Sequence, residues 1–254
     1  MSRLESISLD ELVAVAALQT RVDRKYALER SEAAEVLSAL DPSTRVLEID
    51  GERASAYESV YFDTPDLLSY RMAATARRRR FKLRTRSYLD TAEAFLEMKS
   101  RGARSTTVKE RLPYSMDDRE RLTVEGRDYA DAALGAIGIE TPARLELRPT
   151  LVTRYDRTTL FSPASLGRAT IDTALVWEGA DGRVLRRPRL VIVETKSGAQ
   201  AGEIDRLLWS RGHRPATVSK YGTGLAALRG DLPSNKWTRV LRRHFADTTR
   251  KATP

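Results

Sequence analysis

Three short segments alternate apolar side chains with charged ones, and most of the charges are Lys or Arg. The segments are 81–86, 95–101 and 191–196. Successive side chains of an extended strand point to opposite faces, so each segment would place its charges on one face and its apolar residues on the other. One such segment is typical of any half-buried antiparallel strand. Several with cations on one face predict a charged barrel lining that is stable only around a polyanion.

The positive charge is concentrated in one part of the chain. The net charge is +9, and residues 77–111 contain twelve Lys or Arg against four Asp or Glu. Such a concentration attracts polyanions, whether nucleic acid, anionic lipid or polyphosphate. Net charge alone leaves all three open.

Composition sets further bounds. The chain of 254 residues has 41% apolar and 31% charged residues, which is typical of a globular protein. It contains no cysteine, which excludes disulfides and thiolate metal sites. No apolar run approaches the roughly 20 residues of a membrane span, and residues 1–12 have no signal-peptide character. We therefore expect a cytoplasmic protein.

Local patterns predict about eight strands with helices at the ends and in the connections. A capping box at Ser8–Glu11 predicts a helix through about Leu18, and Asp41-Pro42 ends a helix over 31–40. A further helix is predicted over 115–137, and a helical tail from Glu203, broken at Gly212, Gly222–Gly224 and Pro233. Strand-like runs lie at 21–28, 57–62, 78–88, 94–100, 106–112, 144–156, 167–177, 183–186 and 188–197. This order predicts an antiparallel barrel in an α+β setting.

Ten short segments then occur in the order that characterises one family. They are Asp23–Tyr26, Ser59–Pro65, Lys82–Tyr88, Leu96–Lys99, Lys109–Arg111, Leu147–Leu151, Tyr155–Arg157, Arg168–Asp172, Glu194–Lys196 and Ser219–Tyr221. In these segments the chain resembles the VTC domain, the polyphosphate polymerase domain of the triphosphate tunnel metalloenzyme superfamily. The resemblance implies an α+β fold, an eight-stranded antiparallel β-barrel with flanking helices and a basic tunnel. It covers residues 21–228, leaving a helical segment at 1–20 and a basic helical tail at 229–254.

The resemblance also implies roles for individual residues. Six are expected to act in catalysis: Arg84, Arg86, Lys99, Arg157, Arg168 and Lys196. Six more are expected to bind substrate. The resemblance implies this role for Lys25, Lys109 and Lys220, and the alternation of charges along the predicted strands suggests it for Lys82, Arg101 and Arg111. Glu194 resembles the family's metal-binding carboxylate, with Glu97 and Asp172 as secondary candidates, and the expected ion is Mn²⁺ or Mg²⁺.

The first strand departs from the wider superfamily. The superfamily carries Glu-x-Glu-x-Lys there, whereas this chain has Arg21-Val-Asp-Arg-Lys25. The missing glutamates argue against the hydrolytic branches and leave a metal site of one or two carboxylates. We therefore expect transfer of the γ-phosphoryl group of ATP to a polyphosphate chain. A metal-dependent triphosphatase and a non-catalytic polyphosphate-binding module remain the alternatives.

Two basic segments suggest other partners. The run Ala76–Arg80 could contact nucleic acid, but it leads directly into an alternating strand, and aromatic residues are only 7% of the chain, too few for a base-stacking platform. Nucleic acid is therefore not expected as the main ligand. The amphipathic basic segment 235–245 is expected to be a helix packed on the barrel. The alternative is contact with a membrane or with a membrane partner protein, through which the domain would associate with a membrane.

Overall fold

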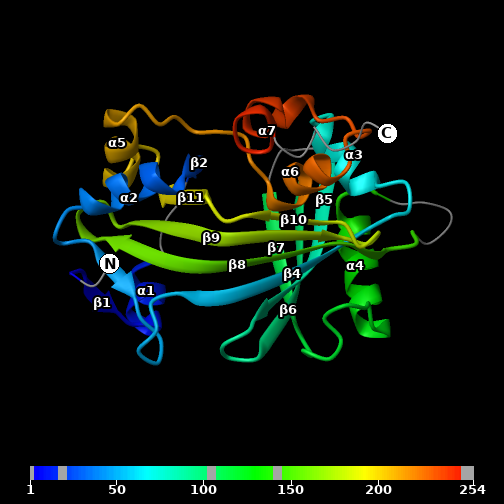
Figure 1. Cartoon of the computed structure of the whole chain (residues 1–254). Helices are drawn as coiled ribbons and strands as arrows, with labels where there is room; N and C mark the ends of the chain where they lie inside the picture. The colour runs from blue at the N-terminus through cyan, green and yellow to red at the C-terminus, as the bar shows by residue number, and fades with distance from the viewer. Residues whose placement is uncertain (1–2, 17–21, 102–106, 140–144, 247–254) are drawn as a thin grey trace. The chain divides into compact units, whose positions relative to one another are not determined.

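A computed structural model describes residues 3–16, 22–101, 107–139 and 145–246 (Figure 1). The chain divides into two compact units. The first comprises residues 1–56, 155–175 and 187–218, and the second comprises residues 57–154, 176–186 and 219–254. Each unit is described separately, and strands β8 (Arg148–Ser162) and β9 (Gly167–Gly179) contribute to both.

The first unit is an antiparallel sheet with strand order β2-β11-β9-β8. A short parallel pair, β1 with β3, accompanies it and was not predicted from the sequence. Its elements, besides its parts of β8 and β9, are β1 (Glu5–Ile7), α1 (Leu9–Ala16), β2 (Val22–Glu29), α2 (Arg30–Ser38), β3 (Arg45–Leu47), η1 (Pro163–Ser165), β11 (Leu190–Ser197) and α5 (Glu203–Ser210).

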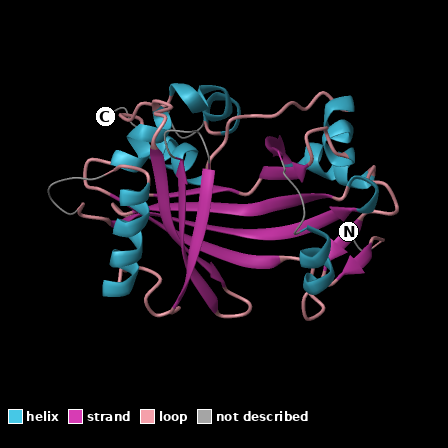
Figure 2. Ribbon diagram, turned by 180° about the vertical axis from the view of Figure 1, so that it is seen from behind, coloured by secondary structure: helices cyan, strands magenta, loops and turns pink. Residues whose placement is uncertain are grey.

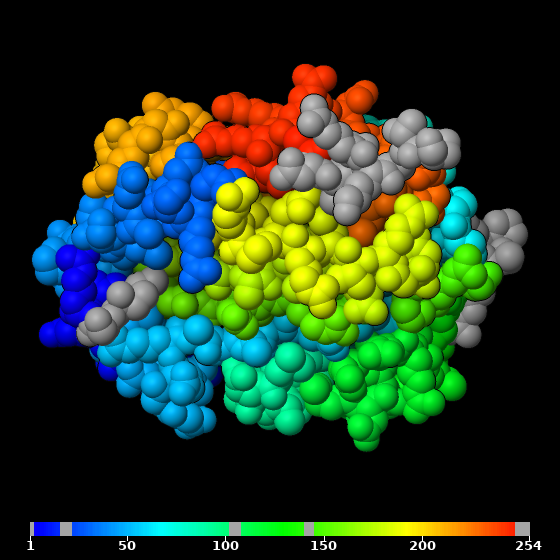
Figure 3. All heavy atoms as spheres, in the orientation of Figure 1, coloured from blue at the N-terminus to red at the C-terminus, as the bar shows by residue number. Residues whose placement is uncertain are grey.

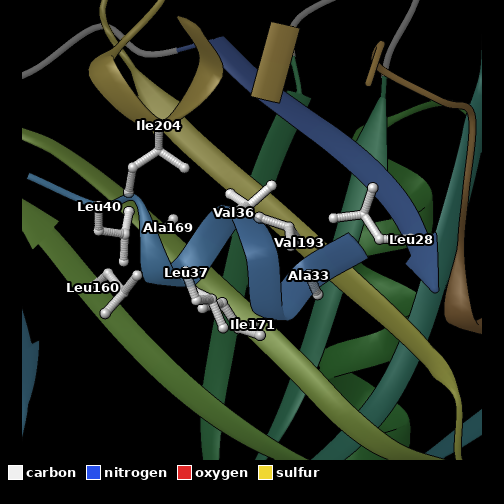
Figure 4. A pocket seen from close by; sticks show the side chains of 10 residues that line it. All are labelled: Leu28, Ala33, Val36, Leu37, Leu40, Leu160, Ala169, Ile171, Val193 and Ile204. Atoms are coloured by element: carbon white, nitrogen blue, oxygen red, sulfur yellow. The ribbon is translucent and has the colours of Figure 1, made fainter. Parts of the chain in front are cut away.

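Helix α2 covers the apolar face of this sheet. Val36 and Leu37 lie with Ile171 and Val193 in one cluster of apolar side chains, as Figure 4 shows. The gap left among these side chains has a volume of only about 10 Å³, no more than a single water requires. We therefore regard this pocket as core packing and not as a ligand site.

In the second unit the sheet order is β8-β4-β5-β6-β7. Helices α6 and α7 contact each other, and Figure 3 shows atoms of the C-terminal part of this unit, coloured orange to red, at the surface. The unit's elements, besides its parts of β8 and β9, are β4 (Ser55–Asp63), α3 (Leu68–Ala74), β5 (Arg80–Tyr88), β6 (Glu93–Arg101), β7 (Thr107–Tyr114), α4 (Val124–Ala136), β10 (Val184–Arg187), α6 (Lys220–Leu228), η2 (Asn235–Trp237) and α7 (Thr238–His244).

Helix α4 covers the apolar face of this second sheet (Figure 2). Its residues Ala130 and Leu134 are buried in one cluster with Leu83, Leu96 and Met98 of β5 and β6. The other face of the same strands therefore remains for the polar residues, as the alternation in the sequence predicted.

The expected antiparallel sheet with flanking helices is confirmed. The main path contains eight strands, from β2 to β7. In the part of the chain that the structure describes, no ladder joins these two end strands, so the ring is not strictly closed. Antiparallel pairings run through β2–β11–β9 and through β4–β5–β6–β7.

The capping box at Ser8 is confirmed, since Ser8 N–H donates to Glu11 and Glu11 N–H donates to Ser8 Oγ. The predicted end of that helix at Leu18, the strand starts at Arg21, 106 and 144, and the final residues of the basic tail lie outside the described residues.

The prediction of one helix over 115–137 was wrong, because α4 begins only at Val124. The hydroxyl of Tyr114 accepts the N–H of Thr123 at 2.7 Å and donates to the carbonyl of Arg121 at 3.0 Å. These bonds hold the intervening segment in turns. Thr123 then caps α4 by accepting the N–H of Gly126.

The predicted helix break at Gly222–Gly224 was also wrong, because α6 runs through both glycines. They serve close packing instead. A Cβ on Gly222 would lie 2.2 Å from the Trp237 ring, and one on Gly224 would lie 2.1 Å from the Trp177 ring. Only glycine leaves room for these buried indoles.

We expect Gly224→Ala to lower the melting temperature. Alanine favours a helix by about 1 kcal/mol, but overpacking against buried Trp177 costs roughly 1–3 kcal/mol, and the indole would also strain its bond to the Lys220 carbonyl. Gly135→Ala in α4 is the matched control, since its Cβ would meet no atom within 4 Å. Thermal denaturation of both variants tests this. A Gly224→Ala protein at least as stable as the control would contradict the packing argument.

Candidate phosphate-binding site

The strands of the second unit place cations in rows on one face, which we call the β5–β7 face. Residues paired across a sheet share a face, so the register assigns them directly. The rows across β5, β6 and β7 are Arg80–Arg101, Lys82–Lys99–Lys109 and Arg84–Glu97–Arg111, with Arg86 opposite Phe95. The predicted common face of Lys82, Arg84 and Arg86 is thus observed, and the side chains between them are buried.

Glu97 is the carboxylate at the centre of this face. It is only 5% exposed, and one oxygen accepts from Arg84 at 2.7 and 3.0 Å while the other lies 3.0 Å from Lys109 Nζ. Arg86 lies 3.7 Å away. Burial alone would raise the pKa of Glu97, but Arg84 and Lys109 outweigh it and hold that pKa below its usual value. Glu97 is therefore an anion that holds cations in place.

Tyr61 of β4 adds an aromatic group that the sequence reasoning did not assign to the site. It is paired with Arg84 across the sheet, and its hydroxyl accepts from Arg84 Nη1 at 3.2 Å. The ring stacks on Tyr221 of α6 with centroids 5.0 Å apart. Tyr61 thus connects the arginine to a helix far along the chain.

Asp63 fixes Tyr221 in turn. The Tyr221 hydroxyl donates to the fully buried Asp63 carboxylate, which also accepts the N–H groups of Ser69 and Tyr70. Burial raises the pKa of Asp63, and these hydrogen bonds oppose the rise. No pattern in the sequence connected the segment 59–65 with the segment 219–221. Their contact is the only signal that could have revealed this role.

Lys82 contacts the start of α6, where Lys220 lies. Ser219 caps this helix by accepting the N–H of Gly222, and Lys82 Nζ donates to the same hydroxyl at 3.1 Å. Lys220 is the first residue of the helix, and its carbonyl accepts the indole N–H of Trp177 at 2.8 Å. The ammonium group of Lys82 and the backbone of Lys220 are therefore both fixed at the start of α6.

The first unit carries the remaining predicted residues on one face of its own sheet. Glu194 of β11 is paired with Lys25 on one side and Thr170 on the other, while Lys196 is paired with Arg168. Glu194 lies 3.5 Å from Lys25 Nζ and 3.3 Å from Lys196 Nζ, and its side chain is 18% exposed. The predicted common face of Glu194 and Lys196 is therefore observed.

Asp172 and Arg157 form the tightest pair on this face. Two guanidinium nitrogens of Arg157 donate to the two Asp172 oxygens at 2.6 and 2.9 Å, and the aspartate is fully buried. A bidentate pair of this kind fixes the guanidinium plane. Asp172 therefore orients Arg157.

The three carboxylates differ in their fit to a divalent cation. Both oxygens of Asp172 are taken by Arg157, and those of Glu97 by Arg84 and Lys109. Glu194 has looser contacts and is the most exposed of the three. The described residues contain no group of three or more His, Cys, Asp or Glu suited to a metal. An ion at Glu194 would therefore take most of its ligands from phosphate and water, as Mg²⁺ commonly does.

Comparisons with known proteins bear on the fold and on the family of the chain. A search of curated proteins finds no match. Among solved structures, the chain is similar to a proposed adenylyl cyclase from Hippeastrum, which is described as having a dominant triphosphatase activity. The two sequences are 15% identical and the TM-score is 0.50. The similarity covers 85% of this chain and 100% of the Hippeastrum chain. A proposed adenylate cyclase from Bacillus halodurans is 12% identical with a TM-score of 0.44, covering 93% of each chain. At such identities the likeness to the Hippeastrum protein concerns the fold alone.

In the described residues no helix is long and apolar enough to cross a membrane.

The sequence matches the family model of the VTC domain over residues 20–229, which contain every residue assigned above to the two cationic faces. The match spans most of the chain and both of its units. The chain is a member of the VTC domain family.

Proposed function

We propose that this protein is a polyphosphate polymerase that transfers the γ-phosphoryl group of ATP to the end of a polyphosphate chain. The observation that carries the proposal is the β5–β7 face, where successive rows of cations run along three adjacent strands with Glu97 as the buried carboxylate among them. Rows lie two residues apart, which is roughly 7 Å in a strand. One triphosphate does not need so many rows, whereas a longer polyanion would use them.

The reaction makes modest demands on the protein. An oxygen of the chain's terminal phosphate attacks the γ-phosphorus, and the bond from that phosphorus to the oxygen of ADP breaks. The attacking oxygen is already anionic at neutral pH, so no general base is required. The transition state is loose, and catalysis consists mainly of positioning and charge neutralisation. Neither a nucleophilic side chain nor either histidine is required.

Particular residues suit these tasks. Arg84, held by Glu97 and Tyr61, offers a fixed guanidinium group for phosphate oxygens, and Arg157 is fixed in the same way by Asp172. Lysines such as Lys82 and Lys25 supply point charges. Glu194 is the residue that would hold Mn²⁺ or Mg²⁺, and such an ion would neutralise charge on phosphate oxygens.

A triphosphatase is the second candidate. The triphosphatase activity described for the Hippeastrum protein supports it, because the two chains share a fold. The same cations would bind the triphosphate, and water would replace the polyphosphate end as acceptor. A module that only binds polyphosphate would need the cations but would have no use for Glu194 beside Lys25 and Lys196.

The nature of the product distinguishes these functions. We expect purified protein incubated with ATP and Mn²⁺ or Mg²⁺ to form acid-labile polymer and ADP, faster when short polyphosphate is added as primer. Polymer is separated from orthophosphate by gel electrophoresis, and heat-treated protein is the control. Steady release of orthophosphate without polymer, under both metals and with primer, would favour the triphosphatase. Binding of polyphosphate with neither product would favour the binding module.

A further inference from the structure

Three cations of the second unit lie together beyond the Lys82 row. Arg80 is the first residue of β5 and Arg101 the last of β6, and the two are directly opposite each other in the sheet. Like charges in such a position are destabilising. Lys236 of η2 is the third member, because its Nζ donates to the carbonyl of Ala73 in α3, the helix that leads into β5, and because the charges of Arg80 and Arg101 lower its pKa. We call these three residues the Arg80 cluster.

None of the three forms an ion pair within the described part of the chain, although most other Lys and Arg residues of the β5–β7 face have a carboxylate or ring partner. Arg80 Nη1 donates to the backbone carbonyl of Arg77 at 2.8 Å, and Lys236 Nζ donates to that of Ala73 at 3.1 Å. Arg101 Nε is buried and has no hydrogen-bond partner among the residues that the structure describes. A buried donor of this kind is costly unless something binds it.

The pKa values of Arg80 and Lys236 also indicate that these cations lack a compensating anion within the described ranges. Burial lowers the pKa of Arg80, and the charge of Arg101 lowers it further. Partial burial and then Arg80 and Arg101 lower the pKa of Lys236. No carboxylate contributes to either shift. Burial and mutual repulsion therefore destabilise the positive charges of the cluster in the ligand-free protein. A bound anion would stabilise them.

The position of the cluster indicates what kind of anion it binds. Arg80 and Arg101 each lie two residues from a member of the Lys82–Lys99–Lys109 row, on the same face and roughly 7 Å further along the strands. On its other side the chain continues into exposed Arg77, which lines an open groove beside α3 together with Leu68 and Met72. The cluster thus extends the cationic face toward the protein surface.

We propose that the Arg80 cluster is a further phosphate-binding site, which holds a phosphate group of a polyphosphate chain beyond the part bound by the Lys82 row. The identification of the ligand as polyphosphate rests on the proposed function. A triphosphate bound at the Arg84 and Lys82 rows would not reach the Arg80 cluster.

Binding of two ligands of different length tests this site. We expect Lys236→Gln, which removes the charge but keeps a donor for the Ala73 carbonyl, and Arg80→Ala to weaken binding of long-chain polyphosphate about tenfold, as loss of one charge-assisted contact does. Affinity for tripolyphosphate should stay within about twofold, and the salt dependence of long-chain binding should decrease by about one counterion per variant. Arg121→Ala, at an exposed residue already paired with Asp118, is the control.

Three results would contradict the proposed site, and each has a different meaning. Equal losses for both ligands would make the cluster part of the triphosphate site, and no loss for either would make it an ordinary solvated patch. A wild-type protein that binds long chains no better than tripolyphosphate would also overturn it. The melting temperature of the ligand-free variants, expected to be unchanged or raised, checks that they fold. Because these measurements need no turnover, a protein that makes no polymer but shows the length-dependent loss would refute the polymerase and leave the site standing.

Discussion

Leu83→Ala should destabilise the protein by about 2–5 kcal/mol, the usual cost of truncating a fully buried leucine. Leu83 has no exposed surface, is paired with Phe62 and Met98 across the sheet, and lies in the cluster covered by α4. Truncation would leave a cavity between the sheet and this helix. Urea denaturation followed by circular dichroism measures the loss in the free energy of unfolding.

The adjacent residue provides the matched comparison. Arg84→Ala removes a side chain from the opposite face of the same strand, and Glu97 keeps Lys109 at 3.0 Å and Arg86 at 3.7 Å. The buried carboxylate is therefore not left without a cation, and we expect a smaller loss of stability than for Leu83→Ala. Affinity for tripolyphosphate should instead fall roughly 10- to 100-fold, as expected from the ~1.5–3 kcal/mol of a hydrogen bond to a charged group.

The two variants together test which face binds the ligand. Titration calorimetry with tripolyphosphate should show an affinity close to wild type for Leu83→Ala at a temperature where it is folded. The opposite result would be that Arg84→Ala unfolds the protein, while Leu83→Ala leaves the free energy of unfolding unchanged and lowers the affinity for tripolyphosphate. The assignment of the two faces would then be reversed and the phosphate-binding proposal would fail.

The faces of the central strands could be predicted from the sequence for a simple reason. Side chains alternate across a strand with a period of two, so Arg84 and Leu83 must point in opposite directions wherever the strand lies. The choice between the faces follows because Leu and Met gain by burial, whereas a buried Arg needs a partner. The same reasoning placed Glu194 and Lys196 together on their strand.

The supports of the site could not be predicted in this way. Tyr61, Asp63 and Tyr221 act through contacts between residues more than 150 positions apart, and no local pattern encodes such a contact. The glycines of α6 were misjudged for a related reason. Glycine weakens a helix locally, but Trp177 and Trp237 pack directly on the backbone there, and tertiary packing outweighs that local preference.

Glu194→Gln should abolish turnover while leaving triphosphate binding intact. Glutamine keeps the size of the side chain but removes the charge that a divalent cation requires. The lost carboxylate lies 3.3 Å from Lys196 and 3.5 Å from Lys25, so its removal takes away an anion that competes with phosphate for both lysines. We therefore expect the affinity for tripolyphosphate without metal to be unchanged or raised, and the binding of Mn²⁺ in the presence of tripolyphosphate to be weakened.

Turnover, metal binding and ligand binding should all be measured on this one variant. Glu178→Gln is the control, because Glu178 is paired with Arg154 at 2.8 Å and belongs to neither cationic face. If Glu194 were only half of a surface ion pair, its replacement would change stability by about 0–1 kcal/mol and leave activity nearly intact, as expected for the control. Small and equal effects of both substitutions on all three measurements would rule out a metal role for Glu194. Loss of turnover with unaltered Mn²⁺ binding would instead indicate that Glu194 positions Lys25 and Lys196 for the phosphate.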